Sequence, residues 1–183
     1  MFIPSFLKSA PQPVQVNVGS GALSAQSVIS SVDLNSSIIL WLGAISNGGG
    51  GFVFGPNHTY LSFADATHVQ GNALSTGDGS NRSVRGLVLE FIHGFLIQNI
   101  YFNTVDLNNV NTNTHNSGLT LGSKAFVVLA GWTGNYNTPS SIIDSIEMID
   151  LSLNIATGVV TATRGGNSGA DNVRVAFFIV DPR

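Results

Sequence analysis

Apolar and polar residues alternate along much of the chain, and the clearest pattern is in its last stretch. From Val173 to Ile179 the odd positions are all apolar, while the even positions begin with Arg174 and turn apolar at Phe178 and Val180. Successive side chains of a strand point to opposite faces of a sheet. We therefore expect a strand at the centre of a sheet, with one face in a core. The face of Phe178 and Val180 should be covered by a second sheet, by 140–154 or by another subunit.

The residues before this strand predict that it belongs to a hairpin. Val159–Arg164 is rich in β-branched residues, and Gly165–Asp171 is a run of turn formers. Two β-rich runs joined by such a loop are typical of a β-hairpin. We therefore expect 159–164 and 172–180 to pair with each other.

Short strands are predicted throughout the chain. The clearest alternation is at Val14, Val16 and Val18, and the longest apolar run is Ile38–Ile45. Many short strands separated by Gly and Asn turns, without a convincing long helix, are typical of a sandwich or a jelly roll. Further strands are expected at 27–32, 52–54, 59–63, 83–91, 94–102 and 124–132, and a polar loop is expected from 71 to 81.

Two stretches are less regular. Residues 140–154 fit a helical stripe through Ile142, Ile146 and Ile149, but Ile149, Leu151 and Leu153 alternate strictly, so a strand is the favoured interpretation. Residues 104–117 are rich in Asn and Thr, which favour loops over strand pairing. The predicted fold is thus an all-β, single-domain antiparallel β-sandwich, jelly-roll-like, over residues 14–183.

We expect residues 1–13 to form an extended N-terminal arm, because Pro4, Pro11 and Pro13 interrupt any periodicity. One interpretation is a frayed terminus. The other is a hook on a neighbouring subunit, since the arm carries four large apolar side chains. These candidates for a subunit interface are Phe2, Ile3, Phe6 and Leu7.

The composition indicates an assembly component. Only 9% of the 183 residues are charged, against about 25% in a typical domain, and the mean hydropathy is +0.27. A soluble monomer usually keeps charge on its surface. If other subunits cover much of the surface, most simply in a homo-oligomer, the small number of charged residues is explained.

Several classes of function are disfavoured. The net charge of −3 and the scattered Lys and Arg residues argue against a nucleic-acid partner. There is no cysteine for disulfides, thiolate metal sites or a Cys nucleophile. The longest apolar run is too short to span a membrane. Pro4 interrupts the apolar start, so we expect no signal peptide and synthesis in the cytoplasm.

No catalytic motif is present, so we expect no enzyme activity and no cofactor. The four histidines lie in separate segments without metal-binding spacing, and no metal site is expected. Glu90 and His93 would point to opposite faces of a strand, and Glu90 is expected to face outward and match Arg82 or Arg85. Three carboxylates could support glycoside hydrolysis, but a solvated or interface face is the favoured interpretation. They are Asp144, Glu147 and Asp150.

The best binding candidate is the segment 132–137. An exposed Trp132 and Tyr136, with Asn135 between them, could stack on a sugar and bond its hydroxyls. The favoured alternative is that Trp132 closes one end of the core.

Three segments near the two ends of the chain form a recognisable set: Ser37–Gly43, Thr161–Arg164 with the Gly-rich turn after it, and Val173–Val180. In these segments the chain resembles small phage virion proteins of jelly-roll type. The resemblance covers about 15–63 and 146–181. The resemblance implies a capsid decoration (cement) protein or a head- or tail-fibre module, usually trimeric.

The resulting expectation is a non-enzymatic phage virion protein. It would decorate and stabilise the capsid surface as a homotrimer, bound to the major capsid protein or other virion proteins. The alternative is a tail or head fibre module that recognises a glycan on the host surface.

Overall fold

The computed structural model is built almost entirely from strands. It describes residues 6–47, 59–74, 81–92, 97–108, 110–135, 149–165 and 172–182. A short 3-10 turn, η1 (Leu34–Ser36), precedes β3. The described strands are β1 (Gln12–Val18), β2 (Ser24–Val28), β3 (Ser37–Asn47), β4 (Tyr60–Asp65), β5 (His68–Asn72), β6 (Asn81–Glu90), β7 (Ile97–Asp106), β8 (Thr112–Asn116), β9 (Phe126–Asn135), β10 (Ile149–Asn154), β11 (Val159–Arg164) and β12 (Asn172–Pro182).

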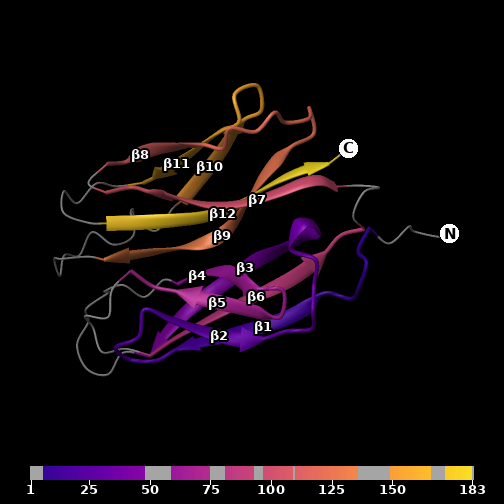
Figure 1. Ribbon diagram of the computed structural model, residues 1–183. Coiled ribbons are helices and arrows are strands. Elements are labelled where there is room, and N and C mark those ends of the chain that lie inside the picture. Colours follow the sequence, from indigo (N-terminus) through magenta and orange to yellow (C-terminus); the bar gives the residue numbers. More distant parts are fainter. Residues whose placement is uncertain are drawn as a thin grey trace.

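These strands form four three-stranded sheets, with the orders β1-β6-β3, β2-β5-β4, β7-β12-β9 and β10-β11-β8. Every strand pair within the sheets is antiparallel. In Figure 1 the β10-β11-β8 sheet lies at the top, the β7-β12-β9 sheet in the middle and the other two below. The predicted all-β, antiparallel, sandwich-like fold is confirmed.

Two hydrophobic cores lie on the two sides of β12. The first core holds Ala176, Phe178 and Val180 together with the inner faces of the two lower sheets, including Val16, Val69, Val84 and Val88. The second core lies between β12 and the top sheet. It consists of Val105, Leu107, Trp132, Val160, Ala162, Val173, Val175, Phe177 and Ile179.

The expectations for the terminal strand are confirmed. β12 lies at the centre of its sheet, between β7 and β9. From Val175 to Val180 its residues are at most 1% exposed, which explains why the alternation of the sequence gives way to a continuous apolar run. A strand that is buried on both faces has no solvent-exposed side, so its sequence contains no alternating polar residues.

The expected hairpin between 159–164 and 172–180 is wrong. β11 pairs with β10 and β8, whereas β12 pairs with β7 and β9, so the two consecutive strands belong to different sheets. Their inward side chains, such as Val160 and Val175, face each other across the second core. Both runs were recognised correctly as strands, but their composition does not determine their partners.

Trp41 joins the middle sheet to the lower ones. Its Nε1 donates a hydrogen bond to the carbonyl of Thr59 at 3.0 Å, and its ring packs against both cores. A Cβ added at Gly131 of β9 would lie 2.7 Å from Cδ1 of Trp41. Gly131 also has a φ of +112°, a value that other residues rarely adopt. Glycine therefore suits this position for two reasons: it leaves room for the Trp41 ring, and it tolerates the positive φ.

Other expectations for single strands are corrected in detail. β2 covers Ser24–Val28 rather than 27–32, and β5 was not anticipated because 68–72 mixes polar residues with a glycine. The Asn- and Thr-rich composition of 104–117 favoured loops without placing the segment; it contains the end of β7 and all of β8, which gains its hydrogen bonds from β11 at the sheet edge. Residues 149–154 form a strand, as favoured. The expected strand at 52–54 lies outside the described residues.

The described part of the N-terminal arm contacts its own chain. The amide of Lys8 donates to the carbonyl of Glu90 at 2.8 Å, and the amide of Ile92 donates to the carbonyl of Phe6 at 3.2 Å. Leu7 forms a β-bridge with Phe91. From Phe6 onward, this stretch is therefore held to the end of β6.

Candidate functional site

The β2-β5-β4 sheet has one apolar and one polar face. Its inner face carries Leu61, Val69 and Gly71, all fully or nearly buried, and a Cβ added at Gly71 would touch Val16 and Val84 of the facing sheet at 3.1 Å. The opposite face carries mainly polar side chains, together with the exposed Val28, because strand residues alternate between faces. We call it the amide face, formed by Ser24, Gln26, Ser62, His68, Gln70 and Asn72.

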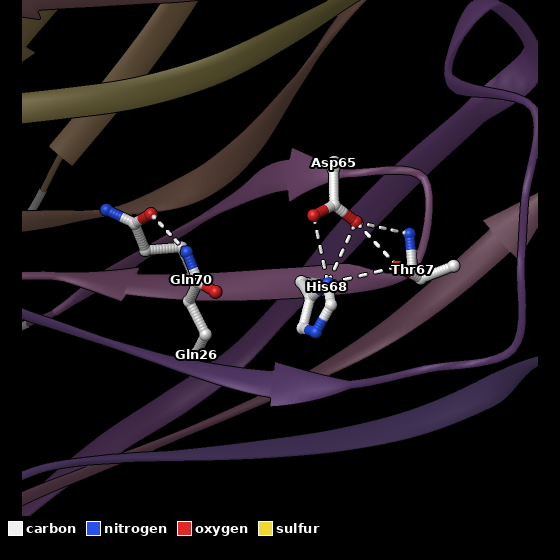
Figure 2. Close-up of polar contacts among 5 residues, drawn as sticks. All are labelled: Gln26, Asp65, Thr67, His68 and Gln70. Atoms are coloured by element: carbon white, nitrogen blue, oxygen red, sulfur yellow. Dashed lines mark hydrogen bonds and ion pairs between the residues drawn. The ribbon is translucent and has the colours of Figure 1, made fainter.

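Side-chain hydrogen bonds run across the amide face. Gln70 donates from Nε2 to Oδ1 of Asn72 at 2.7 Å, and Asn72 donates from Nδ2 to Oγ of Ser62 at 2.9 Å. Gln26 donates from Nε2 to Oε1 of Gln70 at 3.4 Å. The register explains these contacts, because Gln26 and Ser62 both lie opposite Gln70 on the flanking strands. Figure 2 shows the hydrogen bond that joins Gln26 and Gln70.

A compact polar cluster closes the turn from β4 to β5. Oδ1 of Asp65 accepts hydrogen bonds from the amide of Thr67 at 2.7 Å and from its hydroxyl at 2.8 Å. Nδ1 of His68 lies 2.9 Å from both carboxylate oxygens of Asp65 (Figure 2). An Asp side chain that bonds the amide two residues later stabilises a turn.

These contacts lower the pKa of Asp65 to about 2. The largest cause is the hydrogen bond from His68, followed by the bonds from the amide and hydroxyl of Thr67. An aspartate that orients an imidazole also occurs in catalytic triads. Within the described part of the chain, however, no hydroxyl is hydrogen-bonded to Nε2 of His68. The contacts of Asp65 with Thr67 and His68 stabilise the turn.

The structure places Trp132 in the second core rather than on the surface. Trp132 is 3% exposed, and it packs with Val173 and Val175 of the neighbouring strand. A ring so covered offers no face for stacking on a sugar. The interpretation that Trp132 closes the core therefore agrees with the structure, and its proposed glycan contact is corrected.

The other residues predicted to bind are only partly described. Asn135 is the last residue of β9, while Tyr136, Phe2 and Ile3 lie outside the described residues. Phe6 is 54% exposed, although its carbonyl accepts the bond from Ile92. The structure thus leaves the ring of Phe6 available for a contact.

Glu90 does not face outward as expected. It is 5% exposed, and its Oε1 accepts hydrogen bonds from Nζ of Lys8 and from the amide of Asp33, both at 2.9 Å. Glu90 shares the parity of Val84 and Val88, so the alternation of β6 turns it to the inner face. Arg85 instead donates from Nε to Oε1 of Gln15 at 3.3 Å.

The remaining histidines and carboxylates form no common site in the described residues. Nε2 of His115 lies 3.2 Å from the hydroxyl of Tyr101, far along the chain from the turn at His68. Asp150 is exposed on β10. No group of three or more metal-binding side chains gathers among the residues that the structure describes. His58, His93, Asp144 and Glu147 lie outside them.

Sequence reasoning missed both the amide face and the turn cluster. The signal for the turn was present, because Asp65 stands two residues before Thr67, the spacing of an Asx-turn. The amide face had a weaker signal. Gln26, Gln70 and Asn72 are separated in sequence, and only the pairing of β2 with β5 brings them together.

Comparisons with protein families, with curated proteins and with solved structures found no match. Among the described residues there is no helix long and apolar enough to cross a membrane.

Proposed function

We propose that this protein is a non-enzymatic structural protein of a phage virion, which decorates the capsid surface as a homotrimer. The observation that carries the assembly is a set of exposed apolar side chains on a surface that has few charges. The virion setting rests on the resemblance of 15–63 and 146–181 to phage jelly-roll proteins.

Two of the exposed large apolar side chains lie together on the outer side of the β1-β6-β3 sheet. Leu42 is 64% exposed and Ile45 is 56% exposed, and both belong to β3. Leu87 of β6 points to the same outer side, because its neighbours Gly86 and Val88 face inward. We call Leu42, Ile45 and Leu87 the apolar patch.

Burial of the apolar patch would favour association. Removing one large aliphatic side chain from water stabilises an assembly by about 1.5–3 kcal/mol. A closed trimer contains three copies of the patch, and each copy would be buried. β3 is also an edge of its sheet. Cover by a neighbouring subunit would protect this edge from open-ended pairing.

The patch is tested by replacing Leu42 and Ile45 together with Ser. Sedimentation velocity should show a trimer for the wild-type chain and a smaller species for the double variant. Val28→Ser is the matched control, because Val28 is 75% exposed but lies in β2, in a different sheet. An unchanged oligomer in the double variant would remove the patch from the interface.

The virion role is tested by counting copies in purified particles. Quantitative mass spectrometry should find this chain in a fixed stoichiometric ratio to the major capsid protein. A few copies per particle would indicate a tail position, and absence would contradict the proposal.

A second candidate is a fibre module that recognises a host glycan, and the amide face favours it. Gln, Asn and Ser side chains supply both donors and acceptors for sugar hydroxyls, and here three of them already lie in one row. The double variant Gln70→Ala, Asn72→Ala should lose binding to host cells, whereas Gln15→Ala on the outer side of β1 should keep it. Wild-type protein that does not bind host cells would reject this candidate.

A further inference from the structure

Arg164 ends β11 with its side chain directed into the second core. Val160, Ala162 and Arg164 alternate with half-buried residues along the strand and are 0%, 0% and 2% exposed. The first two pack with Trp132 and Val173. The alternation therefore places the guanidinium at one end of the layer between the top and middle sheets, where an apolar side chain would be usual.

The hydrogen bonds of Arg164 satisfy only part of its side chain. Its backbone amide donates to the carbonyl of Asn111 at 2.9 Å, and Nε donates to the carbonyl of Val110 at 3.0 Å. Nη1 and Nη2 are both buried, and neither has a hydrogen-bond partner among the described residues. In this part of the chain, four N–H donors at the end of the core therefore lack an acceptor.

The carboxylates of the described residues do not neutralise this charge. Asp106 forms two hydrogen bonds with Arg174, at 2.7 and 2.9 Å, and Glu90 pairs with Lys8. Asp65 pairs with His68, and Asp33 caps η1. Asp181 accepts from the amide of Gly122 at the far end of β12. Asp150 is exposed on β10.

An arginine side chain keeps its positive charge even when it is buried. A buried charge without a partner carries a large desolvation penalty. The two terminal amino groups form a planar fork that fits the two oxygens of one carboxylate. Since Nε is held by the carbonyl of Val110, the orientation of this fork is fixed before an anion arrives.

We propose that the end of the second core at Arg164 is a binding site for one carboxylate group. The carboxylate is either that of a small free anion or that of an acidic side chain from a second copy of the chain. The site lies on the opposite side of β12 from the first core, and it does not depend on the proposed function.

The first experiment uses the full chain with acetate as the probe. Thermal unfolding is measured in sodium acetate and in sodium chloride at equal ionic strength and pH 7, together with the ¹⁵N shifts of the arginine side chains. Acetate should raise Tm of the wild type in a saturable way, because a ligand that binds only the folded state stabilises it. The Nε and Nη signals of Arg164 should shift in parallel.

Two variants of Arg164 and one control locate the effect. Arg164→Met should lose the response to acetate and remain folded in chloride, since it removes a buried charge without a partner. Arg164→Lys keeps the charge but lacks the fork, and should lose most of the response. Arg85→Met removes an exposed arginine of β6 and should respond as the wild type does.

The second experiment distinguishes the source of the carboxylate. If a second copy supplies it, sedimentation will show self-association that decreases in Arg164→Met and on addition of acetate. Equal behaviour of wild type and Arg164→Met in both experiments would overturn the proposal. It would also be overturned if Asp144→Asn, Glu147→Gln or Asp171→Asn showed strong coupling to Arg164→Met in a double-mutant cycle, because this chain would then supply the carboxylate itself.

Discussion

Phe177 and Phe178 are neighbours in β12, yet they belong to two different cores. Phe177 is 0% exposed and lies in the second core, where its ring meets His115 edge-on at 5.9 Å. Phe178 is 1% exposed and lies in the first core, 5.0 Å from the ring of Phe102. One strand thus supplies a large aromatic side chain to each side of the middle sheet.

Replacing either phenylalanine should destabilise the whole described fold. Phe177→Ala and Phe178→Ala should each cost about 3–5 kcal/mol, the usual range for a buried Phe. Urea unfolding followed by Trp fluorescence and by circular dichroism should give coincident single transitions, because β12 belongs to both cores. Two separate transitions in either variant would show that the cores unfold independently.

Gly86 of β6 should not tolerate a methyl group. A Cβ at this position would clash with Cδ1 of Leu61 and would lie 2.9 Å from Cγ2 of Ile39, and both residues are fully buried. Gly86→Ala should therefore destabilise by about 1–3 kcal/mol through overpacking. Gly19→Ala is the matched control, since the nearest atom to its Cβ is 4.0 Å away. The free energies of unfolding in urea provide the comparison, and equal values would contradict the close packing at Gly86.

The contribution of the Asp65 turn to stability should be lost only at strongly acidic pH. Its pKa is lowered from 3.8 to about 2 in the folded chain, so the unfolded chain binds the proton first. The contribution is present above pH 3.8 and disappears as the pH falls towards 2.

The shift can be measured directly by a carboxyl NMR titration. Wild type should give a pKa near 2 for Asp65, and His68→Gln should move it towards 3.8, since the hydrogen bond from His68 is the largest cause. An unchanged pKa in this variant would mean that Thr67 alone holds the carboxylate.

Removal of the Glu90 side chain should destabilise the end of β6. Glu90→Ala leaves the amide of Asp33 without its acceptor, at a cost of about 1–3 kcal/mol. Glu90→Gln keeps an oxygen at this position and should cost less. Lys8→Met should have the smallest effect, because the side chain of Lys8 is 61% exposed. Chemical denaturation of the three variants tests this order, and a larger loss for Lys8→Met would contradict it.

The sequence predicted the faces of strands better than their partners. The continuous apolar run of β12 was sufficient to predict burial on both sides, because burial acts on each side chain separately. The pairing of β11 was not predictable in this way, since Gly165–Asp171 is long enough either to close a hairpin or to cross between sheets. β8 was missed because an edge strand rich in Asn and Thr carries little apolar signal.

The candidate sites show the same limit. The turn at Asp65 and Thr67 is local and could have been predicted from its spacing. The apolar patch and the burial of the Arg164 amino groups depend on which strands are neighbours. The inward position of Glu90 could have been predicted, because Glu90 has the same place in the alternation of β6 as Val84 and Val88. It was missed because a carboxylate was assumed to prefer water. The hydrogen bond that Glu90 accepts from the amide of Asp33 was not anticipated.

The central place of β12 also has a consequence for synthesis on the ribosome. β12 is the last of the described strands to be translated, and both cores need it. Until Pro182 has left the exit tunnel, β7 and β9 lack the strand that joins them, and their apolar faces stay exposed. We therefore expect the nascent chain to remain a client of chaperones through β11, and to fold only after β12 has emerged.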